Sequence, residues 1–511
     1  MRTTNLLALL LAGSMLAGCS LIPDYQRPEP PVAAAFPTGP AYKAEDSAAK
    51  PAVTADLLGW RDFFADPALQ RLIQIGLENN RDLRVAALNI EAAQAQYRAQ
   101  YANLFPQISA TGGAAFEEIP GNSAFAFGGA TGGASTGASS ASTTIPTGSK
   151  SFYLRSFNAG VGFTNYELDL FGRVRSLSEQ DFEQYVAQAE TRRSTQISLV
   201  AEIAGAWFAV LADRELVHLT EETLKSETAS YDLAKLQLNG GTATALSARQ
   251  AETAVDTARA SLIQYTRQLA QDENALVLLL GQPIPADLPP AQGLAGQGML
   301  AALPAGLPSD LLERRPDVVA AEHNLIAANA NIGAARAAFF PSISLTASDG
   351  VSSSHLNHLF TGPAQTWSFS PQLTIPIFTA GQNEANLDLA KTQKSIQVAQ
   401  YEKAIQTAFR EVADALAARG TYGSQVKAQE DLVAATQDSL DLSQMRFKAG
   451  VDSYLPVLDA ERSLYTAQQN LLALKQAQLT QQATLYKTLG GGWIEKTGEP
   501  APAAEQQAAK E

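Results

Sequence analysis

The chain contains one long segment twice, and this duplication limits the possible folds more than any other feature of its 511 residues. A shift of 209 positions superimposes identical residues without a gap: Gly172 and Gly381, Glu202 and Glu411, Gly241 and Gly450, Glu252 and Glu461, Gly281 and Gly490. Chance is a poor explanation for five matches under one shift. The sequence therefore predicts two structurally equivalent halves that arose by duplication.

Each copy of the repeat has the pattern of a long helical hairpin. In the second copy, apolar residues recur at helical spacing before the turn at 448–452 and every seven residues after it. The seven-residue series are Leu458, Tyr465, Leu472, Leu479 and Tyr486 in the second copy, and Val255, Leu262, Leu269 and Leu276 in the first. A row of apolar residues at this spacing lies along one side of a helix and requires a partner helix to cover it. We predict hairpins over 173–281 and 382–489, and the first helix of the second hairpin should have about 66 residues and measure about 100 Å.

Pro456 is the only proline between Gly381 and Gly490. Proline is tolerated in the first turn of a helix, where backbone N–H groups lack partners anyway. We therefore expect the last helix to begin just before Pro456, with Asp452 as its N-terminal cap.

Each hairpin is preceded by a shorter helical pattern and by two stretches of alternating apolar and polar residues. The helical patterns span 66–104 and 310–339, and both end at a Phe-Pro pair. The alternation predicts strands at about 107–118 and 151–166 in the first half, and at about 342–352 and 366–377 in the second. The halves should therefore span 55–281 and 309–490, joined by a Pro/Gly-rich linker at 282–308.

The alternating strands are typical of a membrane β-barrel around a wet lumen, although a soluble sandwich shows the same pattern. Four strands cannot close a barrel, and unpaired edge groups in hydrocarbon cost several kcal/mol each. Copies of the chain must therefore pool their strands. We predict a mainly α-helical homotrimer, in which an α-barrel of long antiparallel helices is topped by a 12-stranded transmembrane β-barrel with four strands per chain.

Residues 1–18 have the pattern of a secretory signal peptide. The single cysteine, Cys19, follows Leu16-Ala17-Gly18, and this run resembles a bacterial lipobox; ordinary signal cleavage beside an incidental cysteine is the alternative. The resemblance implies N-palmitoyl and S-diacylglycerol groups on Cys19, and the following Ser20 implies sorting to the outer membrane. The proline-rich residues 19–54 should be extended, and 491–511 should be a tail that lacks fixed structure from Ile494 onward.

Composition and motifs argue against several classes of function. The net charge of −14 argues against a nucleic-acid partner. His355 and His358 lie in a polar stretch without cysteine, where a surface loop is a better interpretation than a metal site. The Gly-Ala-Ser-Thr-Gly run at 133–137 matches a hydrolase nucleophile elbow but lacks the flanking strand and helix. We therefore expect no enzymatic activity, no metal and no cofactor apart from the covalent lipid.

Six stretches of the sequence match motifs of one known family: 25–28, 166–173, 311–317, 332–344, 446–454 and 485–493. With these motifs and the lipobox, the chain resembles the outer-membrane factors of tripartite efflux pumps, the OprM-like or NodT-type branch of the TolC superfamily. The resemblance implies a homotrimer in the outer membrane with its α-barrel in the periplasm. It also implies that small molecules arrive from an inner-membrane RND transporter through a periplasmic adaptor protein.

The resemblance further implies a gate where the α-barrel narrows at its periplasmic tip. Leu455 and Asp459 are four residues apart and share a helix face, so three-fold symmetry would place three leucines and three carboxylates around the axis. The apolar ring would resist wetting, and the carboxylates would attract cations. The alternative is that Leu455 packs inside the hairpin and Asp459 is solvated. The repeat equivalents are Leu246 and Gln250, so the acidic ring should come from the second hairpin alone.

The tips of the hairpins carry further candidate residues. Arg446 and Tyr454 are candidates for holding the tip closed through hydrogen bonds to neighbouring chains, with exposed loop residues as the alternative. In the family, adaptor helices would dock at the tips, which here are Gly240-Gly241 and Ala449-Gly450. Glycine permits positive φ and close approach, although a plain turn explains the same residues.

Three functional hypotheses follow. The first is a passive outer-membrane exit duct of an RND-type efflux system, and the lipobox and tip sequence favour it. The alternative is the outer-membrane channel of a type I protein secretion system, which uses the same superfamily. A structural lipoprotein with coiled-coil arms would leave the alternating strands unexplained.

Overall fold

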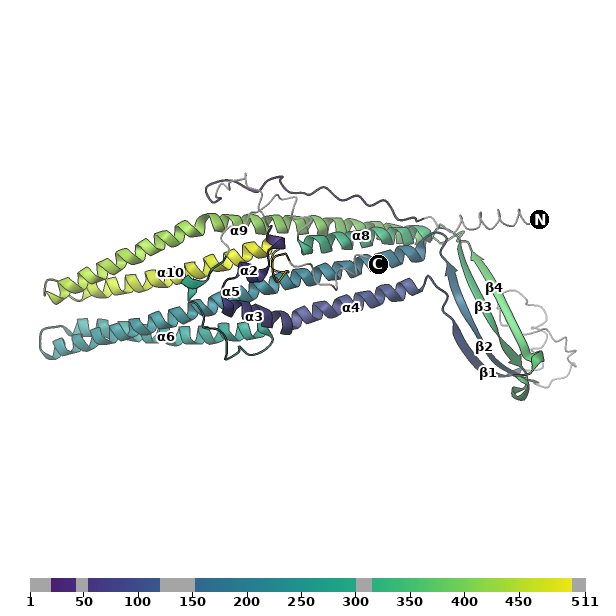
Figure 1. Ribbon diagram of the computed structural model, residues 1–511, viewed down its shortest axis with the longest axis horizontal. Helices are drawn as coiled ribbons and strands as arrows, with labels where there is room; N and C mark the ends of the chain where they lie inside the picture. Colours follow the sequence, from purple (N-terminus) through teal and green to yellow (C-terminus); the bar gives the residue numbers. More distant parts are fainter. Residues whose placement is uncertain (1–19, 43–53, 120–151, 300–314, 499–511) are drawn as a thin grey trace. The chain divides into compact units, whose positions relative to one another are not determined.

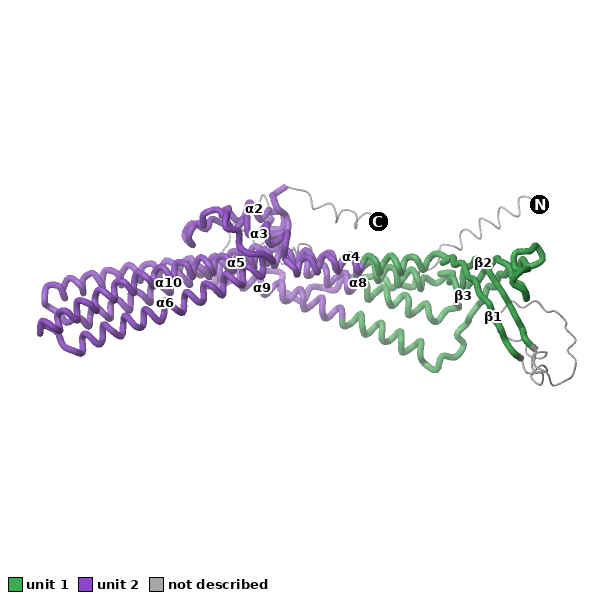
Figure 2. Tube along the Cα trace, turned by 90° about the horizontal axis from the view of Figure 1, so that it is seen from below, with its two compact units in different colours: residues 1–26, 94–183, 326–396 green, residues 27–93, 184–325, 397–511 purple. Residues whose placement is uncertain are grey.

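The computed structural model describes residues 20–42, 54–119, 152–299 and 315–498. The predicted signal peptide, Cys19 and the run at 133–137 therefore lie outside the described residues. The chain divides into two compact units, shown in green and purple in Figure 2. Residues 1–26, 94–183 and 326–396 form the first unit, and residues 27–93, 184–325 and 397–511 form the second.

Helices make up most of the described chain (Figure 1). The four long helices are α5 (Arg173–Asn239), α6 (Ala245–Leu280), α9 (Gln382–Lys448) and α10 (Leu455–Thr488). The shorter helices are α2 (Trp60–Phe63), α3 (Pro67–Asn79), α4 (Arg81–Ala102), α8 (Pro316–Ala337) and the 3-10 turns η1 (Ala55–Leu57), η3 (Leu294–Gly296), η5 (Leu356–His358) and η6 (Gly362–Ala364). The long helices form two hairpins, α5 with α6 and α9 with α10, at the predicted places.

The sequence repeat is also a structural repeat. Helices α5 and α9 both contain 67 residues, and their first and last residues are 209 positions apart. Three glycines with left-handed backbone coincide under this shift, namely Gly172, Gly241 and Gly281 with Gly381, Gly450 and Gly490. Their φ values lie between 69° and 84°, where a residue with a Cβ atom is strained. The glycines therefore match because the two hairpins begin, turn and end with the same backbone geometry.

The helical pattern at 66–104 is not one helix, as the sequence pattern indicated, but two. Asn80 separates α3 from α4, and its Oδ1 accepts a hydrogen bond of 2.9 Å from the N–H of Leu83. Its Nδ2 donates to the carbonyl of Leu279 at 2.9 Å, near the end of α6. Arg315 occupies the equivalent place before α8 and donates to the carbonyl of Thr488 at 3.4 Å, near the end of α10. The same contact thus recurs in both halves with different side chains.

The first unit contains a four-stranded antiparallel sheet with the order β1-β2-β3-β4. Its strands are β1 (Ser109–Ile119), β2 (Phe152–Leu168), β3 (Ser342–Ser353) and β4 (Gln365–Thr374). The last strand was predicted to continue to residue 377 but ends at Thr374. Pro376 has no N–H to donate to a ladder, and Ile377 is 94% exposed. The alternating pattern in the sequence therefore continues beyond the last hydrogen-bonded residue of the strand.

The register of the strands separates an apolar face from a small and polar face. Directly paired residues share a face. One row across the sheet consists of Phe163, Ala347 and Phe369, and the adjacent row consists of Gly162, Ser348 and Ser368. Charged exceptions occur on the apolar face, among them Asp349, which pairs with Val161 and Trp367. The two faces have the character predicted for a barrel wall between lipid and water.

The second unit has a core in which the first half of the chain meets its C-terminal end. Trp60, Phe63, Trp207 and Tyr486 are each at most 1% exposed, and the rings of Phe63 and Tyr486 stack at 4.1 Å between centroids. Helix α5 includes a window that is apolar and long enough to cross a membrane by composition. More than half of that window, 56%, is buried in the fold, as in the core helix of a soluble domain.

The Pro/Gly-rich linker and the start of the tail are both held by hydrogen bonds to helices of the second unit. In the linker, the N–H of Leu294 donates to Glu215 Oε1 at 2.8 Å. In the tail, Ile494 is 7% exposed and its carbonyl accepts from the N–H of Trp60 at 2.9 Å. The prediction that the tail lacks structure from Ile494 onward is therefore wrong for 494–498, while 499–511 lie outside the described residues. The segment is too short for its buried residues to form a recognisable periodic pattern in the sequence.

The N-terminal segment 20–42 contains no helix or strand and lies along other elements. In the first unit, its Leu21 and Pro23 carbonyls accept hydrogen bonds from Arg336 at 3.2 Å and from Asn329 at 2.7 Å. In the second unit, Arg27 forms two hydrogen bonds with the buried carboxylate of Glu322, at 2.7 and 3.0 Å. Residues 20–42 therefore follow other elements without a helix or strand of their own, while 43–53 lie outside the described residues.

Candidate gate at the hairpin tips

Both hairpin tips have the same backbone geometry. In the first, Thr242 N–H donates to the carbonyl of Gln237 at 2.9 Å, and Gly241 N–H donates to that of Leu238 at 3.0 Å. In the second, Val451 and Gly450 make the equivalent bonds, both at 3.0 Å. This is a Schellman motif, which requires a left-handed residue after the helix. The turn itself therefore explains the presence of glycine at 241 and 450. The space around both residues is open, since no heavy atom lies within 4 Å of a Cβ added at either position.

Arg446 binds within its own tip. Its guanidinium donates two hydrogen bonds to Asp452, with Nε–Oδ2 at 2.5 Å and Nη2–Oδ1 at 3.1 Å. These bonds lower the pKa of Asp452 below its ordinary value. Asp452 is therefore not the cap of α10, as was predicted; the capping position is Tyr454, which makes no side-chain cap bond. Because Arg446 is largely exposed, the pair should contribute little to stability and should be sensitive to salt.

Tyr454 points into its own chain. It is 9% exposed, its ring lies 5.5 Å from that of Phe447, and its hydroxyl donates to Glu461 Oε2 at 3.3 Å. The hydroxyl also interacts with Ser230 of α5. Tyr454 is therefore not the exposed loop residue of the alternative, and a bond from it to a neighbouring chain stays a prediction. Its burial depends on the first hairpin, which a local tip pattern cannot reveal.

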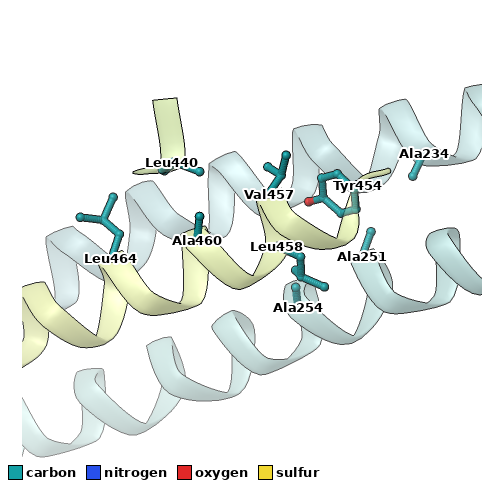
Figure 3. Packing of buried hydrophobic residues seen from close by; sticks show 9 residues of the cluster. All are labelled: Ala234, Ala251, Ala254, Leu440, Tyr454, Val457, Leu458, Ala460 and Leu464. Atoms are coloured by element: carbon teal, nitrogen blue, oxygen red, sulfur yellow. The ribbon is translucent and has the colours of Figure 1, made fainter. Parts of the chain in front are cut away.

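Leu455 and Asp459 lie on the exposed side of α10. Leu455 is 46% exposed, and Asp459 is also exposed, whereas Val457, Leu458 and Ala460 are buried. Figure 3 shows these three buried residues within a cluster that includes Ala251 and Ala254 of α6. The structure thus does not pack Leu455 inside the hairpin. In the first hairpin, Leu246 is 68% exposed and Gln250 is half-buried.

Two buried carboxylates near the tip were not singled out from the sequence. Glu227 of α5 is 4% exposed and Glu461 of α10 is 9% exposed. A signal for Glu461 exists, because it follows Leu458 of the seven-residue seam by three residues, at the second inward-facing position of a heptad. Glu227 has no comparable signal, since α5 does not keep a single apolar face along its 67 residues.

Comparisons with known proteins define the class of protein to which this geometry belongs. The family model described as outer membrane efflux protein matches residues 72–282 and 307–491. The chain is 53% identical over 509 residues to the probable efflux pump outer membrane protein TtgC of Pseudomonas putida, covering 100% of this chain and 99% of that protein. It is 40% identical over 480 residues to the cation efflux system protein CusC of Escherichia coli, covering 94% and 96%.

A solved structure agrees with the sequence relatives. The open-state crystal structure of the MtrE outer membrane channel of Neisseria gonorrhoeae matches with a TM-score of 0.80 and 38% identity, covering 94% of this chain and 100% of that one. The chain therefore belongs to the outer membrane efflux protein family. It is an outer-membrane duct for efflux, with long helical hairpins and a small antiparallel sheet.

Proposed function

We propose that three copies of the chain assemble into a passive exit duct, in which a closed 12-stranded β-barrel crosses the outer membrane and twelve long helices form a periplasmic α-barrel. The sheet carries this proposal. Its outer strands, β1 and β4, have no further strand partner among the described residues, and one face is apolar. Lipid does not tolerate such edges, so β4 of one copy must pair with β1 of the next.

Small molecules are the cargo class that we propose, with energy supplied by an inner-membrane RND transporter. Relatives at 53% identity are named for antibiotic efflux and for toluene efflux. The duct itself performs no reaction on its cargo. A strain that lacks the gene should become hypersensitive to antibiotics and solvents, and the full-length chain should restore resistance. Loss of a secreted protein with unchanged resistance would instead support a type I secretion channel.

A periplasmic adaptor protein is the partner that we propose for the hairpin tips. The open space around Gly241 and Gly450 supports close approach of another helix. Apolar side chains are also exposed there without a partner in the described chain, since Val451 is 62% exposed and Met445 is 58% exposed. Exposed apolar residues at such a position favour a protein contact.

The lipid anchor on Cys19 is supported by the path of the residues that follow it. Arg336, which holds the Leu21 carbonyl, lies near the end of α8 and six positions before β3 begins at Ser342. Cys19 is two residues from Leu21, so its acyl chains would start near the first residues of the membrane strand. Buried acyl CH₂ groups contribute about 0.8 kcal/mol each to anchoring.

We predict that Cys19→Ala abolishes incorporation of labelled palmitate while the chain keeps its folded hairpins. The reason is that the thiol and the new N-terminal amine of Cys19 are the acylated groups. Metabolic labelling followed by intact-mass measurement checks this, with Ser20→Ala as the matched control that should remain acylated. Label retained by Cys19→Ala would refute the anchor.

The gate that we propose consists of Leu455 and Asp459, with Leu246 and Gln250 as the first-hairpin equivalents. Its support is the exposure of Leu455 and Asp459 on one side of α10, opposite the buried face of that helix. In a ring, three copies of this side can meet only around the symmetry axis.

A further inference from the structure

The two hairpins of one chain are joined along α5 and α10 by polar contacts inside an otherwise apolar seam. Thr220 and Tyr465 share a hydrogen bond of 2.8 Å between their hydroxyls. Nearer the tip, Glu461 lines the same groove as Ser226 and Ser230 of α5, which lie on either side of Glu227 in the sequence, and the charge of Glu461 acts on Glu227. The surrounding cluster consists of small and apolar residues of all four long helices, including those in Figure 3. The seam therefore contains a like-charge pair where burial makes charge expensive.

Neither carboxylate is fully compensated by its surroundings. Glu227 Oε2 is buried and has no hydrogen-bond partner, whereas Glu461 Oε2 accepts from Tyr454. The neighbouring Arg462 on α10 offsets only part of the cost at Glu227. On α6, the exposed Arg249 is occupied by Glu252 at 2.5 Å.

Lys448 of α9 is a further charged group beside the seam. It lines the groove of about 250 Å³ beside Tyr454 and Glu461. It is not among the charges that shift the pKa of Glu227. Among the described residues, Arg462 is the positive charge that acts on Glu227, and it does not cancel the effects of burial and of Glu461.

A proton is the species that can neutralise this pair. Burial, followed by the repulsion from Glu461, raises the pKa of Glu227 to about 7 from an ordinary value of 4.5. Burial also raises the pKa of Glu461. With one proton bound, one carboxyl group is neutral and the repulsion disappears; when the proton leaves for bulk water, two buried charges remain.

We propose that Glu227 and Glu461 form a proton-dependent latch that holds α10 against α5 when the pair is protonated and loosens this seam when both carboxylates are charged. The inference rests on the gate proposed above, because α10 carries Leu455 and Asp459 just before Glu461. Glu461 is only two residues from Asp459, so movement of α10 away from α5 also moves the proposed gate residues.

The direction of the pH dependence follows from the raised pKa. An acid that is weaker in the folded protein than in the unfolded chain favours the folded arrangement most below its unfolded pKa. That advantage is lost as the pH rises through the folded value. The seam should therefore be tightest below about pH 4.5 and weaken up to about pH 7, with no further change above it.

Hydrogen exchange of the full-length protein in lipid nanodiscs tests the latch. After correction for intrinsic chemistry, exchange of the first turns of α10 should accelerate by up to about tenfold per pH unit between about pH 5 and 7, the limit for one proton. E227Q should keep the slow exchange at every pH, because its amide is uncharged, cannot lose a proton in this range and does not repel Glu461. E461Q should reduce the pH dependence, since it removes the repulsion.

The matched control is E252Q, which changes the repeat equivalent of Glu461. Glu252 is 36% exposed and pairs with Arg249, so this variant should show the pH dependence of the unmodified protein. Exchange of α10 that does not change with pH, or that changes equally in E227Q, would overturn the latch.

Channel recordings on the same samples separate the latch from the duct. If the unmodified protein conducts and its α10 exchange is independent of pH, the latch is wrong and the duct stands. If α10 exchange follows pH as expected but the open fraction is the same in all variants at every pH, the pH-dependent seam stands and its link to the proposed gate is wrong. If both hold, the open fraction should rise with pH in the unmodified protein and in E252Q but not in E227Q.

Discussion

Leu455→Ala is expected to increase the open fraction of the channel in planar bilayers by about tenfold or more. A leucine buried against its symmetry mates contributes about 1.5–3 kcal/mol to a closed ring. Each change of about 1.4 kcal/mol alters the ratio of open to closed channels tenfold. Recordings at matched protein density measure the effect, and Leu442→Ala is the control, because Leu442 is a comparably exposed leucine (57%) on α9. Equal open fractions of the two variants would show that Leu455 is not part of the gate.

The charge of the proposed ring can be tested apart from its apolar part. Asp459→Asn should lower the preference for cations over anions, measured as a shift of the reversal potential in a salt gradient. Three carboxylates near one axis attract cations, and the amides do not. Gln250→Ala should leave the reversal potential unchanged, since the first hairpin contributes no charge at this position. A large shift in Gln250→Ala with none in Asp459→Asn would reverse the assignment of the ring to the second hairpin.

Gly281→Ala is expected to destabilise the protein much more than Gly241→Ala. Both glycines have left-handed backbone, with φ of 69° and 74°, so alanine costs about 1–2 kcal/mol at each. At Gly281, however, the new Cβ would overlap the carbonyl of Asn79 at the end of α3, whereas the space at Gly241 is empty. Forced repacking adds about 1–3 kcal/mol at the first site only.

The midpoint of denaturant unfolding of the two variants provides the comparison. Because their backbone strain is nearly the same, the difference between them reports the contact between α6 and the end of α3. Equal midpoints would mean that the added methyl group at position 281 fits beside the Asn79 carbonyl without a cost in stability.

Repetition made the two long hairpins predictable to within a few residues. A helix of 67 residues is set by its apolar period and by the glycines at its ends, and both are visible in the sequence. The division of the sheet into two faces was predictable for the same reason, since side chains in a strand alternate. These features depend on regular spacing, which sequence patterns report directly.

The features that the sequence did not reveal depend on contacts between distant residues. Asn80 interrupts a helical pattern because its side chain caps α4 and also binds Leu279, although the apolar spacing continues across it. Asp452 is an exception, because its partner Arg446 is only six residues away; this contact occupies the carboxylate that could have capped α10. Within the candidate gate, the exposed side of α10 was predicted, while the inward position of Tyr454 depends on α5 of the other hairpin.

The number of chains in the membrane-embedded protein tests the account most directly, because one sheet of four strands with two open edges cannot seal a tube alone. Native mass spectrometry of the full-length protein released from lipid nanodiscs gives this number. We expect a single species containing three chains, with no monomer at any concentration that preserves the fold. A folded monomer in lipid, stable with β1 and β4 unpaired, would contradict the shared barrel and every assignment of a ring to the gate.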